Sequence, residues 1–424
     1  MFISSLVVAG MLMLAAPPES VGPGIGAVTD STASVWVRLP LGKKAICRLV
    51  DQSGPGGSGT LTPPDVEKLI EDENDRVVQF DFSGLIPMHA YSFEIRPDEG
   101  EAVQGQFQTL VRTGNPSKVS IAFGSCANDK ADVENPSWRA ILRAQPDVLC
   151  LIGDTPYIDS TKLDVQRERY RTFFSGAGLR EVIATIPTIG LWDDHDFGQD
   201  GADGRLEGKE NSLKAFNEYH ANPARSDAEG VYTSFRAGDA EVFLLDARWF
   251  ANSETRELLG EKQWKWLEDG LTASTASFKL LTCGMIWNDS VRPLKTDYIG
   301  HYPNERKRLF EFIENHKIGG VVLVGGDIHR SRALKHERAA TGVSYPLYEV
   351  VTSPLGTNVH ATANVAHKGL VFDAGEPHSF CVMTVDSLDT QNSKLTIRWQ
   401  NAAGKELFVL PLEASQLQVQ RGNK

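Results

Sequence analysis

The chain has 424 residues and a formal net charge of −12 at pH 7. Its length predicts two domains, or one large α/β domain with an appendage. An acidic protein repels the phosphate backbone of nucleic acids, so we expect no nucleic acid as a bulk partner, and an enzyme of this charge that acts on phosphates needs local cations.

The first segment, Met1–Ala16, is apolar but shorter than the ~20 residues of a comfortable membrane span, and two prolines follow it. We interpret residues 1–19 as a signal peptide, which predicts export to the periplasm, the cell surface or the medium. The segment has no Lys or Arg and therefore no twin-arginine motif. A misassigned start codon is the alternative interpretation. No later segment resembles a transmembrane span.

Residues 20–112 have the pattern of a small β-sandwich. Short stretches that favour strands are separated by turn residues, and no segment has helical periodicity. The predicted strands are residues 33–39, 45–49, 77–82, 91–95 and 103–110. The turn Thr113–Pro116 marks a boundary to the second predicted domain.

Residues 117–424 alternate strands with helices, which predicts an α/β domain. Predicted strands cover residues 119–123, 148–152, 187–192, 241–245, 278–285 and 320–324, and predicted helices cover 136–144, 163–174, 261–271 and 304–316. The last part, at 347–352, 379–385, 394–399 and 406–412, has strands with little helix between them. The run at 148–152 is wholly apolar, as in a strand buried on both faces.

The five cysteines are scattered, odd in number and without a C-x-x-C pair. They predict neither a disulfide framework nor a zinc ribbon. Cys150 and Cys283 lie in apolar runs and are expected to be buried as small hydrophobic residues. Cys126 differs, because it follows a strand in a polar, Gly-rich context.

Four predicted strands are followed by possible metal ligands. Each ligand alone has an ordinary explanation, such as a packed cysteine, an aspartate helix cap or a solvated acidic turn. Four together at the carboxyl ends of strands, where open α/β sheets bind ligands, are not expected by chance. They are Cys126, then Asp154 with Tyr157, then the run Asp193–Asp196, and finally Asp327 with His329.

The ligand types indicate the chemistry. Carboxylates favour hard cations such as calcium, magnesium and manganese, whereas thiolate and phenolate suit ferric iron. A mixed set predicts two or more unlike metals that share a carboxylate, Asp154. His195 lies beside carboxylates that keep it protonated, which suits a general acid. Arg248, at another strand end, has two interpretations: it grips phosphate oxygens or it forms a structural ion pair.

These motifs, in this order, resemble those of the PhoD-like alkaline phosphatases and phosphodiesterases. The motifs are Phe123-Gly-Ser-Cys126, Gly153-Asp-x-x-Tyr157, Trp192-Asp-Asp-His-Asp196 and Gly326-Asp-x-His329. The resemblance implies a four-layer α/β metallophosphoesterase-type sandwich of two mixed sheets flanked by helices, preceded by a fibronectin-III-like β-sandwich. It also implies ferric iron and calcium as cofactors, and hydrolysis of small phosphate esters by a metal-activated water or hydroxide.

The resemblance implies particular roles for residues of this chain. The implied metal ligands are Cys126, Asp154, Tyr157, Asp194, Asp327 and His329, and the implied acid is His195. The chain departs from the family where many relatives have an asparagine after the Trp-Asp-Asp-His-Asp run. Asp200 fits that place best, with Gln199 as a rival, and an extra carboxylate there would change the metal selectivity. The alternative to an enzyme is a non-catalytic exported surface or binding protein that keeps a structural metal.

Overall fold

The computed structural model describes residues 19–53, 63–130, 132, 134–224, 229–293 and 295–419. Residues 1–18, which make up almost all of the predicted signal peptide, lie outside the described residues. Within the described ranges, no helix is both long enough and apolar enough to cross a membrane.

The N-terminal strands form two antiparallel sheets with a core of their own between them. One sheet has the order β1-β2-β5, with β1 at Val21–Val28, β2 at Thr32–Arg38 and β5 at Val77–Ser83. The other has the order β4-β3-β6-β7, with β3 at Lys44–Asp51, β4 at Val66–Leu69, β6 at Ala90–Pro97 and β7 at Val103–Gln108. Alternate side chains point inward, as the period-two pattern predicted.

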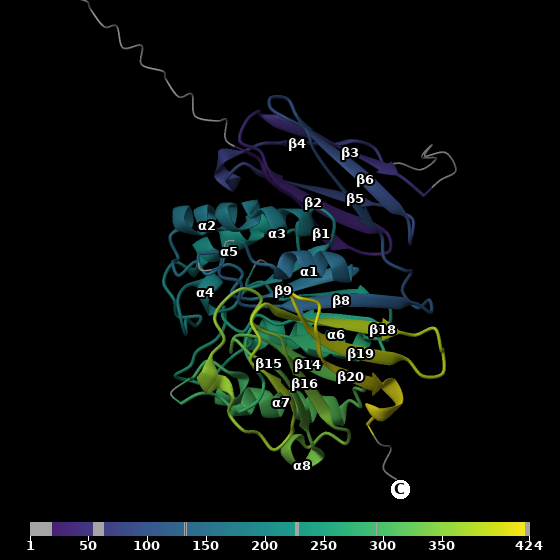
Figure 1. Cartoon of the computed structure of the whole chain (residues 1–424), viewed down its shortest axis with the longest axis vertical. Helices are drawn as coiled ribbons and strands as arrows, with labels where there is room; N and C mark the ends of the chain where they lie inside the picture. Colours follow the sequence, from purple (N-terminus) through teal and green to yellow (C-terminus); the bar gives the residue numbers. More distant parts are fainter. Residues whose placement is uncertain are drawn as a thin grey trace, which may run out of the picture.

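This sandwich rests on the helices of the larger part of the chain (Figure 1). The Trp36 ring packs edge-on against Phe174 and Tyr219, with ring centroids 5.1 and 5.8 Å apart. Strand β1 comes so close that the Ala27 N–H donates to the Ala221 carbonyl at 2.7 Å. The sandwich is therefore attached through packing and hydrogen bonds as well as through the chain itself.

The larger part contains two mixed sheets. The first has the order β10-β9-β8-β18-β19-β20, and its strands are β8 at Lys118–Gly124, β9 at Val148–Ile152, β10 at Thr188–Leu191, β18 at Ser379–Asp386, β19 at Lys394–Asn401 and β20 at Glu406–Glu413. In it β8, β9 and β10 are parallel, and β18 pairs antiparallel with β8.

The second sheet has the order β11-β12-β13-β14-β16-β15-β17. Its strands are β11 at Thr233–Ala237, β12 at Ala240–Leu244, β13 at Phe278–Thr282, β14 at Val321–Gly325, β15 at Ser331–His336, β16 at Leu347–Val351 and β17 at Leu370–Ala374. The four central strands β12, β13, β14 and β16 are parallel, so their carboxyl ends share one edge.

Helices cover the outer faces of the two sheets (Figure 1). Four of them lie between the sandwich and the first sheet: α1 at Ser137–Ala144, α2 at Leu163–Ser175, α3 at Ala177–Ile183 and α5 at Lys209–Tyr219. The helices that follow β12 and β13 are α6 at Gly260–Ala273 and α7 at Pro303–Asn315. Two short helices are α4 at Asp194–Phe197 and α8 at Arg338–Thr341. The arrangement of two mixed sheets between helices is the four-layer α/β architecture that the sequence predicted.

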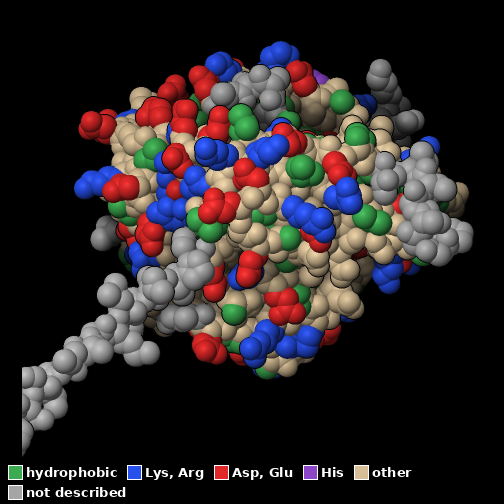
Figure 2. All heavy atoms as spheres, turned by 90° about the horizontal axis from the view of Figure 1, so that it is seen from above, with side chains coloured by type: hydrophobic (Ala, Val, Ile, Leu, Met, Phe, Trp, Pro, Cys, Tyr) green, Lys and Arg blue, Asp and Glu red, His purple; other side chains and the backbone are tan. Residues whose placement is uncertain are grey.

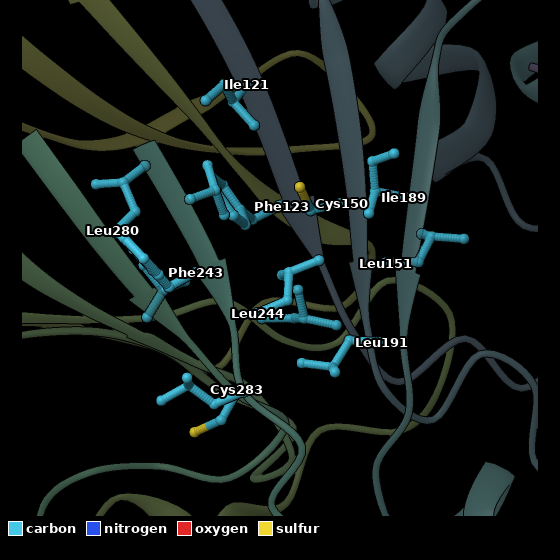
Figure 3. Packing of buried hydrophobic residues seen from close by; sticks show 14 of the residues in the cluster. Ile121, Phe123, Cys150, Leu151, Ile189, Leu191, Phe243, Leu244, Leu280 and Cys283 are labelled. Atoms are coloured by element: carbon cyan, nitrogen blue, oxygen red, sulfur yellow. The ribbon is translucent and has the colours of Figure 1, made fainter. Parts of the chain in front are cut away.

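The core lies between the two sheets, where side chains from both meet. Figure 3 shows Phe123 and Cys150 of the first sheet together with Leu244 and Leu280 from the second, and all four are buried. Strands β9 and β14 are buried at every position, which explains their wholly apolar sequences. This core packs the two sheets face to face and so brings together the strand ends that carry the polar residues.

A buried histidine couples this packing to pH. His220 follows α5, stacks on Phe216 with centroids 4.1 Å apart, and lies so close to Gly190 that a Cβ there would be 2.2 Å from the ring. Burial lowers the pKa of His220 to about 4. The unfolded chain binds this proton more readily, so the contribution of His220 to stability is intact above pH 6.5 and falls as the pH drops towards 4.

We therefore expect protonation of His220 to cost about 3 kcal/mol of unfolding free energy between pH 7 and pH 4. Urea unfolding at the two pH values measures this loss, and it should shrink by that amount in His220→Phe. His316→Phe, which changes an exposed histidine at the end of α7, is the control and should leave the loss unchanged. An equal loss in His220→Phe and in the unchanged protein would contradict the assignment.

Candidate metal centre

The four strand ends singled out in the sequence meet at one edge of the molecule. The ligand atoms of Cys126, Asp154 and His329 lie within 4.8 Å of one another, and so do those of Asp154, Asp194 and His195. The first set is fully buried, and in the second only His195 is partly exposed. Asp154 belongs to both sets. We name the first set, together with Tyr157 that is hydrogen-bonded to His329, the thiolate group. We name the second set, together with Asp327 on the wall of the adjoining cavity, the carboxylate group.

Left-handed backbone is concentrated at this place. Cys126, Asp154, Asp327 and His329 have φ angles of 60°, 53°, 67° and 50°. Such angles are unfavourable for residues with a side chain and persist only where surrounding contacts hold them. Those contacts are hydrogen bonds between neighbouring strand ends: the Cys126 N–H donates to the Gly153 carbonyl, and the Ala127 N–H donates to the Asp154 carbonyl. Backbone strain at candidate ligands is a hallmark of functional sites.

Two glycines let the strand ends approach one another. A Cβ on Gly153 would lie 2.5 Å from the Cβ of Asp193, and one on Gly326 would lie 2.3 Å from the Ser125 hydroxyl. Neither approach is possible for a larger residue without a shift of the backbone. The Gly-Asp pairs in the sequence therefore have a steric reason, because the glycine makes room and the aspartate supplies the ligand.

The thiolate group has the hydrogen bonding of a metal site. His329 Nδ1 lies 2.8 Å from the Asn358 carbonyl oxygen, so this nitrogen carries the proton and Nε2 presents its lone pair. His329 Nε2 lies 2.8 Å from the Tyr157 hydroxyl, and Cys126 Sγ lies 3.5 Å from Asp154 Oδ2. All four candidate ligands of this group thus point at one another.

The charges of the thiolate group favour a cation. Burial, together with the surrounding carboxylates, raises the pKa of the Cys126 thiol, the Asp154 carboxyl and the Tyr157 hydroxyl above their ordinary values. Asp154 Oδ1 is buried and has no hydrogen-bond partner among the described residues. A bound cation would satisfy this oxygen and stabilise the thiolate and phenolate forms, so the residues present fit a metal ion.

The carboxylate group places an acid beside the cavity. His195 Nδ1 lies 2.5 Å from Asp159 Oδ1, and its ring lies 4.4 Å from that of Tyr157. Burial alone would lower the pKa of His195, but Asp194 and Asp159 outweigh it and raise the pKa above its ordinary value. Burial acts to raise the pKa of Asp194, but the positive charges of Arg248, His195 and Lys295 outweigh it. They lower the pKa below its ordinary value, so Asp194 is ionised.

The remaining two aspartates of the acidic run have structural roles. Asp193 is the N-cap of α4, and Asp196 completes a capping box by accepting the Asp193 N–H at 2.5 Å. Asp196 also accepts the Thr155 N–H at 3.2 Å. The members of the run Asp193–Asp196 therefore have different roles. The first and last hold the turn, His195 lines the cavity, and Asp194 lies beside Asp154 and His195.

The contacts of Arg248 are those of a structural ion pair, the second of the two interpretations that the sequence left open. Its guanidinium is 1% exposed and lies 2.5 Å from Asp193 Oδ1, with a second contact to Asp297 at 3.4 Å. Another of its nitrogens donates to the Ala202 carbonyl at 3.1 Å. With its donors committed in this way and its side chain absent from the cavity wall, Arg248 is placed as a buried ion-pair residue and has no contact with the cavity.

Asp200 is not brought into either group of ligands. Its side chain is 77% exposed, and its carboxylate lies 4.0 Å from His195 Nε2. The reason is that the chain turns after α4, so the Gly201 N–H reaches the Asp194 carboxylate at 2.7 Å while the Asp200 side chain stays on the rim. Gln199, the rival for this place, is exposed as well.

Some cavity residues had no signal in the sequence. The cavity, with a volume of about 60 Å³, is lined by Asp154, His195, Asp327 and His329, and also by Arg292, Lys295 and His360. His360 stacks on His329 with ring centroids 4.2 Å apart. The arginines that flank the Asp-x-His motif do not line the cavity: Arg330 pairs with Asp373, and Arg332 is wholly buried.

The position of Asn288 is explained by a buried carboxylate. Its side-chain amide donates to Glu349 at 2.8 Å, and His336 lies 2.7 Å from the other oxygen of Glu349. Glu349 also accepts the Trp287 N–H. Asn288 therefore holds the start of the loop that carries Arg292 and Lys295.

A sequence model described as PhoD-like phosphatase matches residues 121–420. The chain belongs to the PhoD-like phosphatase family. The match covers the two large sheets and all of the candidate ligands, and it leaves out the N-terminal sandwich.

Individual relatives are more distant. The chain is 24% identical to alkaline phosphatase D of Bacillus subtilis (strain 168) over 314 residues, which are 60% of this chain and 54% of that protein. The alignment thus spans about half the length of this curated relative. A solved structure of PhoD matches with a TM-score of 0.77 at 19% identity and covers 96% of this chain and 94% of the other.

A purple acid phosphatase from yellow lupin (Lupinus luteus) seeds also shares the fold. It matches with a TM-score of 0.71 at 13% identity, over 92% of this chain and 74% of the other. At such identities the likeness establishes the shared fold alone.

Proposed function

We propose that this chain hydrolyses phosphate esters with a metal centre formed by the thiolate and carboxylate groups. The observation that carries the proposal is the sharing of Asp154 by two sets of ligands, with His195 at the edge of the same cavity. A shared carboxylate holds two cations close enough to act on one phosphoryl group. The proposed substrate is a small phosphate ester.

The donor types support unlike metals in the two groups. Ferric iron is proposed for the thiolate group, held by Cys126, Asp154, Tyr157 and His329, because thiolate and phenolate suit a strong Lewis acid. Calcium is proposed for the carboxylate group, held by Asp154, Asp194 and Asp327, because carboxylate oxygens suit a hard cation. When bound, these ions supply charge that stabilises the transferring phosphoryl group and activates the attacking water.

The residues of the chain supply orientation and a proton. Asp159 accepts the Nδ1 proton of His195 and so fixes the ring with Nε2 on the cavity side. His195 donates the Nε2 proton to the leaving oxygen as the ester bond breaks. Burial lowers the pKa of His195, but Asp194 and Asp159 outweigh it and raise the pKa above its ordinary value, which favours the acid form. Arg292 on the cavity wall supplies local positive charge, which an acidic protein needs to admit a phosphate.

Export is part of the proposal. Its support is the apolar segment Met1–Ala16 with two prolines after it, which has the length and composition of a signal peptide. Since the segment has no twin-arginine pair, the proposed route is the general secretory one, and metal loading then takes place outside the cytoplasm.

The function is tested with aryl phosphate monoesters and diesters, with iron and calcium added or removed by a chelator. We expect His195→Ala to lower kcat by about 10²- to 10⁴-fold. The loss should be smaller for a 4-nitrophenyl ester than for a phenyl ester, because a better leaving group needs less help from an acid. The same assay distinguishes a monoesterase from a diesterase.

The control variants separate this role from a structural one. His316→Ala, remote from the cavity, should keep full activity, whereas Asp159→Asn should reduce kcat by a smaller factor than His195→Ala and leave KM unchanged. An equal loss of kcat on both esters in His195→Ala would argue against proton donation. No turnover under any metal condition would favour the alternative, a non-catalytic surface or binding protein.

The described surface offers that alternative little support. On the face seen in Figure 2, towards the sandwich, apolar side chains are scattered singly among acidic and basic ones. The large hydrophobic residues exposed on the described part of the sandwich are Leu41, Ile46, Leu69 and Met88. Adhesive faces usually gather such residues into one patch.

A further inference from the structure

A lysine ammonium lies on one of the candidate metal ligands. Lys295 Nζ is 2.8 Å from Asp327 Oδ2 and 3.0 Å from Asp327 Oδ1, so it contacts both oxygens of that carboxylate. The Lys295 side chain is 5% exposed. A cation provided by the chain itself thus lies against Asp327, although Asp327 Oδ2 has no hydrogen-bond partner among the described residues.

A second carboxylate holds the same ammonium. Asp297 Oδ1 lies 2.8 Å from Lys295 Nζ, and Asp297 Oδ2 lies 3.4 Å from the Arg248 guanidinium. Asp297 is not in either ligand group. Asp297 can therefore remain the ion-pair partner of the ammonium when another cation binds Asp327. The buried Arg248 guanidinium holds Asp297 in position.

We propose that Lys295 is a built-in competitor for the metal of the carboxylate group. The ammonium and a divalent cation repel each other and need the same oxygens of Asp327, so each ion that binds there has to displace Lys295 onto Asp297. The inference rests on the proposed function, because it takes Asp154, Asp194 and Asp327 as the ligands of the second metal. Its consequence is a weak and exchangeable second metal beside a tightly held first one.

The thiolate group is not subject to this competition. Its ligand set contains Cys126, Asp154 and His329, and Tyr157 is hydrogen-bonded to His329. Among the described residues, the ion pairs of Lys295 are with Asp297 and Asp327. The two metals of one centre should therefore respond differently to removal of the lysine charge. Only the carboxylate group should gain affinity.

The test measures calcium binding without substrate, by equilibrium dialysis of the full chain after iron loading. We expect Lys295→Met to bind Ca²⁺ at least tenfold more tightly than the unchanged protein, with the same iron content. Lys295→Arg keeps the charge and should retain the original affinity. Lys279→Met is the matched control, because Lys279 is also buried but donates to the Ala276 carbonyl, so its removal should not change calcium affinity.

The outcomes distinguish this inference from the proposed function. Equal or weaker Ca²⁺ binding in Lys295→Met, with circular dichroism and iron content unchanged, overturns the competition even if the enzyme is active. Tighter binding in an inactive protein supports the competition and counts against the function. If Lys295→Met does not fold, Lys295→Gln removes the same charge with a polar side chain and is held to the same tenfold criterion.

Discussion

Asp154→Asn is expected to lower kcat/KM for aryl phosphates by about 10³-fold or more and to leave the protein nearly free of iron. The reason is that Asp154 is the one carboxylate common to both ligand groups, and a neutral amide cannot hold two cations. Iron content and the tyrosinate-to-iron absorption band measure the loss. Tyr157→Phe should remove the band as well, since it removes the phenolate.

The same change should stabilise the metal-free protein. Burial raises the pKa of Asp154, and the charges of Asp194, Asp193 and the neighbouring aspartates raise it further. An acid whose pKa is raised by folding costs stability above its ordinary pKa, so the neutral amide removes a cost that is present at pH 7. We expect the melting temperature in chelator to rise by a few degrees.

The control for Asp154→Asn lies at the other end of the same strand. Asp147 precedes β9 and accepts the Ser120 N–H at 2.7 Å, far from the cavity along the strand. Asp147→Asn should keep both activity and iron. If Asp154→Asn retained iron and a visible band, the thiolate group would not depend on the shared carboxylate and the proposed centre would be wrong.

Arg248→Met is expected to destabilise the protein by about 3–5 kcal/mol. The change leaves the buried carboxylate of Asp193 without its ion-pair partner and removes the contact that holds Asp297. Urea unfolding measures the effect. Arg205→Met, which removes an arginine with a 44% exposed side chain, serves as the control and should leave the free energy of unfolding nearly unchanged.

The stability measurement is paired with kinetics of the folded fraction. If Arg248 acts only through Asp193, the remaining folded enzyme should bind substrate with an unchanged KM. A variant of normal stability whose KM rises more than tenfold would instead restore the interpretation that Arg248 grips phosphate oxygens. The two predicted roles of this arginine thus have opposite signatures.

The strand ends were predictable because each is marked by local sequence. A wholly apolar run followed by glycine and aspartate predicts a buried strand and marks the residue at which it ends. This is so for β9, which is followed by Asp154, and for β14, which is followed by Asp327. The parallel pairing of β8, β9 and β10 then brings their ends together. The local sequence pattern, together with the rule that ligands bind at the carboxyl ends of parallel strands, was therefore sufficient to predict these strands and the ligands that follow them.

Residues that act through long-range contacts could not be predicted in this way. Asp159 and Lys295 lie in segments without periodicity, and only the fold brings them to His195 and Asp327. Arg248 could not be assigned because a strand-end arginine looks the same whether it faces substrate or a buried aspartate. Strands β15 and β17 and helix α5 were also missed, since their patterns are irregular and tertiary packing decides them.

The pairing of β8 with β18 has a consequence for how the chain is made. Strand β8 ends at Gly124, whereas its neighbour β18 begins at Ser379. One edge of β8 therefore stays unpaired while the ribosome makes the intervening chain, which takes on the order of ten seconds or more. An uncovered edge of a hydrophobic strand invites pairing with other chains. We expect the nascent protein to need protection by chaperones, and a metal ion to enter only after translation has ended.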